Sequence, residues 1–427
     1  MAYAEASTPT LRMSPSVMEN QCLAMVISDL KGSPASLDLK LFYRVFNLLP
    51  ERLGRSRLLD TAVKMFSLHH LGKAHGDDRL VHEARWSYGE SLARLRRALD
   101  HRRHWATTET FTAAMLICMY ELFAAPTSFD AWMAHAAGMA RLAQMRGAKS
   151  FENDCDRLLF VAFRGLWIME ALFGGHDTFL REPDWQQIAM PRLDPTITDE
   201  QHELMLELSN ELAFIPVLVR DGIALRMLIA QGEFDPSQVA KLTNRGLRLY
   251  YRFKNWHERW AVSVGVPREV PSATGDKLFP MVFAYQNFGF ATVYCSYYAC
   301  MIILQELLNV CKYPQDFDAD NAEMVNNICK SVEYNGSGSL GPYRMGFSVR
   351  IAMEVASLEV KSWIINWITQ VSKNYAVLSP QNFPKLDERP TLDVVSGEAI
   401  KMKYGDLSSS EPLSSSDSSD SPSPPGS

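Results

Sequence analysis

Apolar side chains recur every three or four positions along most of this chain. In the segment that begins at Asp78 they fall at Val81, Ala84, Tyr88, Leu92, Leu95 and Leu99. This spacing places them on one face of an amphipathic helix. The same period predicts helices over residues 59–66, 111–123, 158–173, 200–260 with interruptions, 280–310, 321–332 and 347–371. Strict alternation of apolar and polar residues, the pattern of a strand, is rare, and no convincing strand pair is found. The predicted fold is therefore all-α.

Proline and glycine mark where two of these helices end. Pro126 follows the helix at 111–123, and proline cannot continue the hydrogen-bond ladder of a helix. Gly174 and Gly175 follow the helix at 158–173, where glycine favours a left-handed C-cap. Both helices are therefore expected to stop at these positions.

One stretch is apolar enough to raise the question of a membrane. No charged residue lies between Lys277 and Glu306, a length that could span a bilayer. Gln286, Asn287, Ser296 and four tyrosines interrupt it, and no pronounced basic flank is present. The pattern favours a central helix buried by other helices, and no membrane association is predicted.

Composition divides the chain into three parts. Residues 1–36 are rich in Ser, Pro and Met and are predicted to be mostly disordered. Residues 37–377 are predicted to form one large multi-helix domain. Residues 378–427 form a Ser/Pro/Asp-rich tail that is expected to be disordered, because it has almost nothing to bury.

The tail contains candidate phosphorylation sites of two kinds. Ser408 and Ser414 each have a carboxylate three residues later, and Ser421 and Ser423 each precede a proline. Added phosphate changes function only where a partner recognises the new charge. A solvated tail without function is the alternative.

Bulk composition indicates a protein of a reducing compartment with a large core. The 427 residues are 47% hydrophobic, and the net charge of -6 gives no general attraction to nucleic acid or anionic membranes. The seven cysteines are odd in number and irregularly spaced, which disfavours a disulfide framework. The N-terminal run MAYAEASTPTLRMSPSV lacks the apolar stretch of a secretory signal.

Metal sites are not predicted. The chain contains no C-x-x-C pair, and Cys295 and Cys300 are five apart on a predicted helix. His69, His70 and His75 lack the spacing of four that a helical metal pair needs, and are expected to close a helix C-terminus.

Other candidate chemistry is weak as well. Gly336, Gly338 and Gly341 spell G-x-G-x-x-G, but a predicted helix precedes them, so we expect a connector and no cofactor. A basic run contains Arg94, Arg96, Arg97, Arg102 and Arg103. With Leu95 and Leu99 turned inward, we favour a solvated helix face for these arginines over a phosphate-binding face. No nucleophile elbow, P-loop or framed carboxylate pair is found, and the chain is predicted not to be an enzyme.

The run FDAWMAHAAGMARLAQMRGAKSF carries the most informative pattern. Its spaced residues are Trp132, His135, Gly138, Leu142, Arg146 and Gly147, and Met139 and Met145 are placed on the same helical stripe. Gly138 is expected to let a neighbouring backbone approach closely. Gly147 is expected to end the helix with a left-handed conformation, and Arg146 to bond free carbonyls there. His135 is interpreted as a packing residue without chemistry.

This pattern, W-x-x-H-x-x-G-x-x-x-L-x-x-x-R-G, resembles the regulatory domain of fungal-specific transcription factors. The resemblance covers roughly residues 55–190. It includes the later run Phe179–Trp185, in which Pro183 and Trp185 match the family's F-L-x-x-P-x-W pattern. Members of that family usually bind DNA through a six-cysteine zinc cluster near the N-terminus, and those cysteines have no counterpart here.

The resemblance implies a nuclear protein, also present in the cytoplasm, that controls transcription. Targets in the family are often genes of metabolism or secondary-metabolite clusters. Without a zinc cluster, the chain is expected to act through protein partners, such as a DNA-binding regulator or a second copy of itself, or through a small effector. Direct sequence-specific DNA contact is not expected. The alternative is a helical ligand-binding or scaffold protein with no direct transcriptional role.

Overall fold

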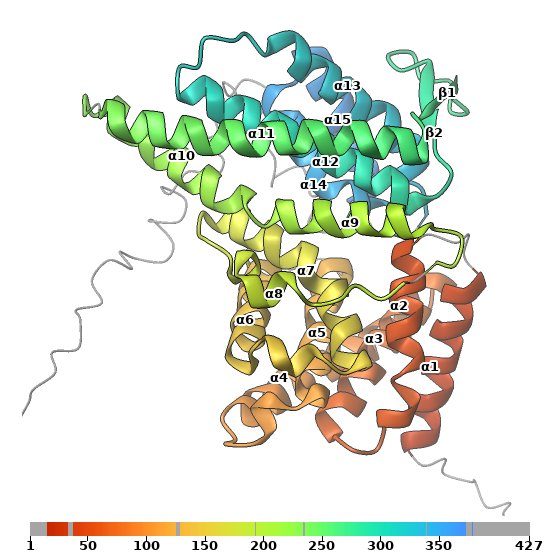
Figure 1. The fold of residues 1–427 in the computed structure, drawn as a ribbon. Helices are drawn as coiled ribbons and strands as arrows, with labels where there is room; N and C mark the ends of the chain where they lie inside the picture. The colour runs from red at the N-terminus through yellow and green to blue at the C-terminus, as the bar shows by residue number, and fades with distance from the viewer. Residues whose placement is uncertain are drawn as a thin grey trace, which may run out of the picture.

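The described residues fold almost entirely into helices, which confirms the predicted all-α class. A computed structural model describes residues 15–32, 37–124, 129–192, 194–233, 235–338, 340–372 and 378. The helices gather in two halves that follow each other along the chain, with α9 lying across the middle (Figure 1). The candidate phosphorylation sites Ser408, Ser414, Ser421 and Ser423, and also Pro126, lie outside the described residues.

The first half is built around α5, whose described side chains are mostly buried. Its helices are α1 (Pro15–Gly32), α2 (Leu37–Asn47), α3 (Arg57–His75), α4 (Asp78–Leu99), α5 (Thr108–Ala124), α6 (Phe129–Arg146), α7 (Asp154–Gly174) and the single turn α8 (Pro183–Gln186). Short 3-10 turns cover Pro50–Arg52, His104–Ala106, Ala148–Phe151 and Phe179–Arg181. Helices α3 and α4 form an antiparallel pair that packs against α5.

The second half is built around α12, which packs against α10, α11, α13 and α14. Its helices are α9 (Asp199–Leu212), α10 (Ile215–Ala230), α11 (Pro236–Val264), α12 (Phe288–Val310), α13 (Asp318–Asn335), α14 (Gly341–Val355) and α15 (Leu358–Val371). Strands β1 (Arg268–Pro271) and β2 (Met281–Ala284) form an antiparallel hairpin between α11 and α12. Figure 1 shows that the long helix α11 extends beyond the first half, so the second half is the wider of the two in this view.

The uncharged stretch forms the central helix that the sequence predicts. By length and composition α12 could cross a membrane, but 83% of its most apolar window is buried inside the protein. The helices around it supply the apolar surroundings that a bilayer would otherwise provide. Its N-terminus is fixed by Asn287, whose side chain accepts a hydrogen bond from the backbone N–H of Phe290 at 2.9 Å.

Local signals fix both ends of α3 and the end of α7, and the end of α7 lies where the sequence predicts it. α7 stops at Gly174, and Gly175 adopts the left-handed conformation with φ of 67°. α3 begins after Ser56, whose hydroxyl accepts a hydrogen bond from the N–H of Leu59, and ends at His75. Of the three histidines expected at this C-terminus only His75 lies there, since His69 is buried in the helix interior.

Four elements differ from the sequence-based predictions. Residues 15–32, assigned to a mostly disordered segment, form helix α1, which packs on α2 and α3. The helix expected over 347–371 is broken into α14 and α15 at Ser357, which caps α15. The β-hairpin was not predicted, because strands of four residues show too little alternation. Leu99 is 43% exposed and does not turn inward.

Candidate functional site

Helix α6 buries a stripe that differs from the predicted one. Trp132, Met139 and Leu142 are buried as expected, and Ala136 and Ala143 complete the buried face. Met145, placed on the same stripe by the sequence, is 56% exposed. The helix is therefore rotated so that its alanines, which the pattern ignored, face the core.

Gly138 does not make the predicted close approach. It is exposed, and a Cβ atom placed on it would meet nothing within 4 Å. The prediction was wrong because Gly138 lies roughly a third of a turn around the helix from the middle of the buried stripe. Its side-chain position faces open space.

His135 binds a buried carboxylate of the neighbouring helix. Its Nδ1 atom lies 2.5 Å from Glu121 Oε2, and Glu121 is fully buried on α5. The hydroxyl of Tyr88 on α4 donates to the other oxygen of the same carboxylate. The Glu121 carboxylate thus joins α4, α5 and α6, and His135 supplies the contact from α6.

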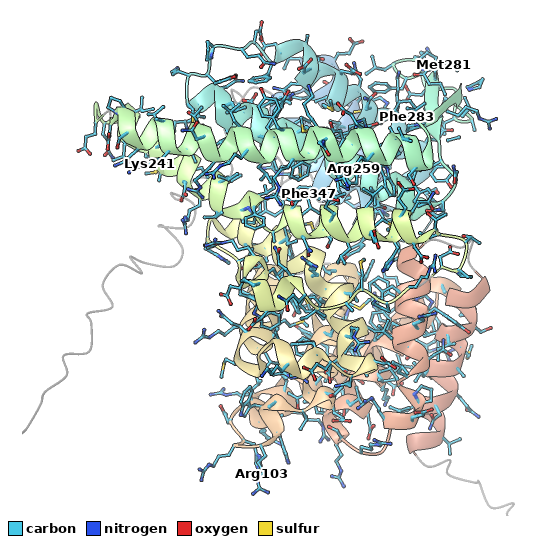
Figure 2. All side chains as sticks on the ribbon, viewed as in Figure 1. Arg103, Lys241, Arg259, Met281, Phe283 and Phe347 are labelled. Carbon is cyan, nitrogen blue, oxygen red and sulfur yellow. The ribbon has the colours of Figure 1, made fainter. Side chains whose placement is uncertain are left out.

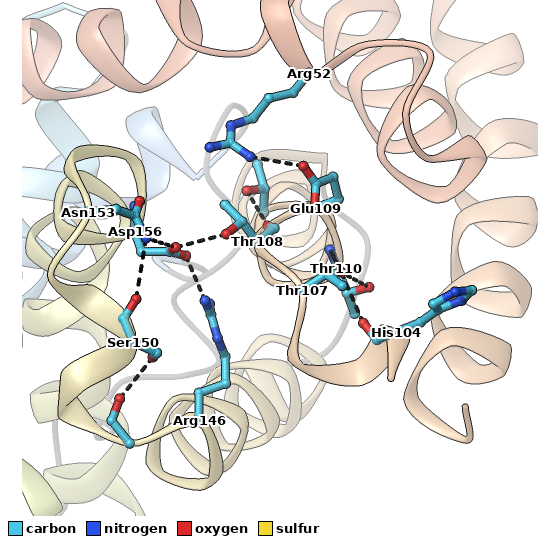
Figure 3. Close-up of polar contacts among 12 residues, drawn as sticks. Arg52, His104, Thr107, Thr108, Glu109, Thr110, Arg146, Ser150, Asn153 and Asp156 are labelled. Atoms are coloured by element: carbon cyan, nitrogen blue, oxygen red, sulfur yellow. Dashed lines mark hydrogen bonds and ion pairs between the residues drawn. The ribbon is translucent and has the colours of Figure 1, made fainter. Parts of the chain in front are cut away.

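Arg146 forms a buried ion pair instead of bonding helix carbonyls. Its Nη2 atom lies 2.9 Å from Asp156 Oδ1 on α7, and the two side chains are 4% and 1% exposed (Figure 3). Asp156 also accepts hydrogen bonds from Thr108 Oγ1 at 2.8 Å and Asn153 Nδ2 at 2.5 Å. The carboxylate therefore ties α5, α6 and α7 together.

The remaining motif residues also shape the backbone and the core. Gly147 ends α6 with φ of 77° and ψ of 155°. The predicted positive φ is confirmed, but the backbone lies outside the left-handed helical region that was expected. It adopts an extended conformation that is open essentially only to glycine. Pro183 occupies the first turn of α8. Trp185 is buried and stacks on Phe160, with ring centroids 5.9 Å apart, and meets Phe179 edge-on at 4.5 Å. The matched residues therefore place helices and carry no reactive group into a cavity.

The G-x-G-x-x-G run is a connector between helices, as predicted. Gly336 follows α13 and Gly341 begins α14, so no strand precedes the glycines. Each of the seven cysteines is a free thiol, six of them buried and Cys22 half-buried. In the part of the chain that the structure describes, no three His, Cys, Asp or Glu side chains lie close enough together to hold a metal ion.

A cavity of about 210 Å³ lies where the two halves meet. We call it the junction cavity. Its walls come from α2 and α7 of the first half and from α10, α12, α14 and the end of α9 in the second. Most lining side chains are apolar, among them Phe42, Ile168, Leu212 and Phe347. Phe347 is labelled near this junction in Figure 2.

Helix α12 contributes the polar wall of the junction cavity. Thr292, Ser296 and Cys300 line it at intervals of four, so they share one face of the helix. The Thr292 hydroxyl donates to the carbonyl of Phe288 at 2.9 Å. No hydrogen bond between the Ser296 side chain and another described residue is found, which leaves its hydroxyl open to a ligand. Burial raises the pKa of the Cys300 thiol, which therefore stays protonated at neutral pH.

Arg344 lines the junction cavity, and backbone carbonyls hold its guanidinium in place. Its Nε atom donates to the carbonyl of Asn335 at 2.9 Å and Nη2 to the carbonyl of Ser337 at 2.6 Å. Its centre lies 4.2 Å from the ring of Phe288. This buried, fixed charge adds a positive potential to the wall of the junction cavity.

Gly165 lies on α7 at an exposed part of the cavity wall. It lines the junction cavity, and a Cβ atom built there would meet nothing within 4 Å. Its φ is not positive, so a side chain at this position would enter the free space without backbone strain. The glycine therefore contributes to the size of the cavity.

No pattern along the chain indicated this cavity. Its lining comes from six helices, and each residue looks like an ordinary core or helix-surface position when read along the chain. The spacing of Thr292, Ser296 and Cys300 is visible, but small polar residues at that interval are common in buried helices.

Similarity to a known protein covers 30% of this chain. No family model matches the chain, and no solved structure matches it. A protein of Emericella nidulans, described only as uncharacterized, is 31% identical over 129 residues, which cover 30% of this chain and 27% of that protein. The chain thus matches little more than a quarter of the length of this curated relative.

Proposed function

We propose that this chain is a fungal transcriptional regulator that lacks its own zinc-cluster DNA-binding domain and responds to a small, mostly apolar effector. The resemblance in the α6 motif and in the Phe179–Trp185 run supports the regulatory role. The junction cavity carries the proposal of an effector. It joins a partly enclosed, mostly apolar space to one fixed cation and one open hydroxyl, a combination typical of small-molecule sites.

The position of the cavity provides a mechanism for regulation. Its walls belong to both halves, so a bound molecule contacts α7 on one side and α12 and α14 on the other. A ligand shifts a conformational equilibrium by its difference in affinity between the two states. An effector that fits only one arrangement of the halves would therefore favour that arrangement, and with it the surface offered to protein partners.

The dimensions restrict the effector to a small molecule. An apolar protein cavity of about 150 Å³ is large enough for benzene. At about 210 Å³ the junction cavity suits a single ring with a short substituent. A carbonyl or carboxylate on that substituent would be attracted by Arg344 and could accept a hydrogen bond from Ser296.

A reporter assay with one matched pair of variants tests this function. The chain fused to a heterologous DNA-binding domain should change transcription of a reporter in a fungal host. Gly165→Met should abolish any response to apolar aromatic acids by occupying part of the cavity. Gly138→Met, at a helical glycine that does not line the cavity, should leave the response intact. Absence of any reporter effect together with an exclusively cytosolic location would refute the transcriptional role.

The second candidate is a helical ligand-binding protein with no transcriptional role. The same cavity favours it, since nothing in the cavity depends on transcription. It predicts that the purified chain binds small aromatic acids, that Gly165→Met removes this binding, and that the tethered chain leaves the reporter unchanged. Binding and reporter measurements on the same variants therefore separate the two functions.

A further inference from the structure

A second concave site lies at the far end of the first half. A cleft of about 660 Å³ opens among the loop before α3, the C-terminus of α4 and the turn before α5. Six of its lining side chains are basic, namely Arg55, Arg57, Arg94, Arg97, His101 and His104. We call this the basic cleft. Figure 2 labels the nearby Arg103 at the opposite end of the first half from Phe347 of the junction cavity.

The positive charge of the basic cleft is largely uncompensated. Glu109 is the carboxylate among its lining residues, and it is already bound to Arg52 at 2.9 Å (Figure 3). Arg94 pairs with Glu90. Within the described ranges, Arg55, Arg57 and Arg97 form no ion pair, and all three are exposed. Such a cluster is notable in a chain whose net charge is -6.

Two helix N-termini add to this charge. The first turn of α3, capped by Ser56, and the first turn of α5, with Thr107 and Thr110, both line the basic cleft. The Thr107 hydroxyl accepts a hydrogen bond from the N–H of Thr110 at 3.2 Å, which orders this turn. A helix N-terminus carries a partial positive charge, so both turns favour an anion in the cleft.

The rings of His101 and His104 form a flat wall of the cleft. Their centroids lie 3.8 Å apart with the planes inclined by 19°. His101 Nδ1 accepts from the backbone N–H groups of Arg103 and His104, each at 3.3 Å, so the turn that carries the pair is fixed. The basic cleft therefore combines guanidinium groups from separate segments with a rigid pair of stacked imidazole rings.

We propose that the basic cleft binds a small organic polyphosphate. Arginine is well suited to phosphate because its planar guanidinium presents several donors that match the phosphate oxygens. Three exposed arginines from two separate segments can contact several phosphate groups at once, and a volume of about 660 Å³ falls in the usual range for small-molecule sites. Duplex DNA is disfavoured, because the chain has a net charge of -6, which opposes binding to a long polyanion.

Calorimetric titration of the full chain with sodium tripolyphosphate at 150 mM salt tests the proposal. Tripolyphosphate should bind at least tenfold more tightly than inorganic phosphate. The triple variant Arg55→Gln/Arg57→Gln/Arg97→Gln should lose at least tenfold in affinity for tripolyphosphate. All three positions are exposed, so the fold should be retained.

A charge-matched variant provides the control. Arg96→Gln/Arg102→Gln/Arg103→Gln removes the same charge from exposed positions on the same helix and turn that do not line the cleft. Its affinity should change less than twofold. Equal losses in both variants would show a diffuse electrostatic effect and overturn the proposal. The same holds if the wild-type chain fails to bind tripolyphosphate, or if it binds duplex DNA more tightly than tripolyphosphate through the cleft arginines.

Discussion

Replacing Asp156 by alanine tests whether the Arg146–Asp156 pair holds α5, α6 and α7 together. The substitution removes the partner of Arg146 at 2.9 Å and the acceptor for Thr108 at 2.8 Å. It also removes the acceptor for Asn153 at 2.5 Å. The Arg146 side chain, only 4% exposed, would keep its charge without a carboxylate.

The expected loss of stability is large. Removing one partner of a buried ion pair typically costs about 3–5 kcal/mol, because the other charge stays buried without compensation. The rings of Phe111 and Phe151, at 4.9 and 5.1 Å from the Arg146 guanidinium, offset part of this cost by cation–π attraction. We therefore expect Asp156→Ala to lower the free energy of unfolding by about 3–4 kcal/mol.

Urea unfolding monitored by circular dichroism measures the change. The matched control is Asp154→Ala, two residues away, whose side chain is 90% exposed and pairs with Arg157 at 3.2 Å. It should cost less than about 1 kcal/mol. The double variant Arg146→Met/Asp156→Leu, which removes both charges, should recover most of the loss. A cost below about 1 kcal/mol for Asp156→Ala would refute the reasoning, because the buried charge would then be compensated in another way.

Three further predictions follow from single sites. Gly138→Leu should change the free energy of unfolding by less than about 1 kcal/mol, since its side chain enters open space and leucine favours a helix; a larger loss in urea unfolding would restore the close-approach interpretation. Burial lowers the pKa of His69 to about 4, whereas the pKa of this side chain in the unfolded chain is about 6.5. Between these two values the unfolded chain binds the proton more readily, so the stability of the fold decreases as the pH falls from about 6.5 to about 4. His69→Phe should reduce this loss by on the order of 2 kcal/mol at pH 4.5, and equal pH dependence in both proteins would contradict it. Burial raises the pKa of the Cys295 thiol to about 12 and also raises the pKa of the Cys300 thiol. Neither thiol should therefore react with iodoacetamide at pH 8 until urea unfolds the chain, and peptide mass mapping measures this reaction.

Sequence periodicity predicted much of the secondary structure because it is a local property. The pattern from Asp78 gave α4, and the uncharged stretch gave the buried α12. Gly175 ended α7 as predicted, since a left-handed C-cap depends only on the residue and its immediate neighbours. The rotation of α6 was predicted less well, because alanine at positions 136 and 143 is as acceptable on the surface as in the core.

The sequence by itself determined that this chain is helical, that α7 ends at Gly174 and Gly175, and that α12 lies in the core. Only the tertiary structure decided which residues from separate helices meet. It paired Arg146 with Asp156, and it enclosed the junction cavity between two halves of the chain. It also brought Arg55 and Arg57 beside Arg97 in the basic cleft, whereas the sequence favoured a solvated face for the arginines of α4. The physical reason is that helix formation depends on spacing within a few turns, whereas a cavity or a charged cleft depends on packing between segments far apart in the sequence.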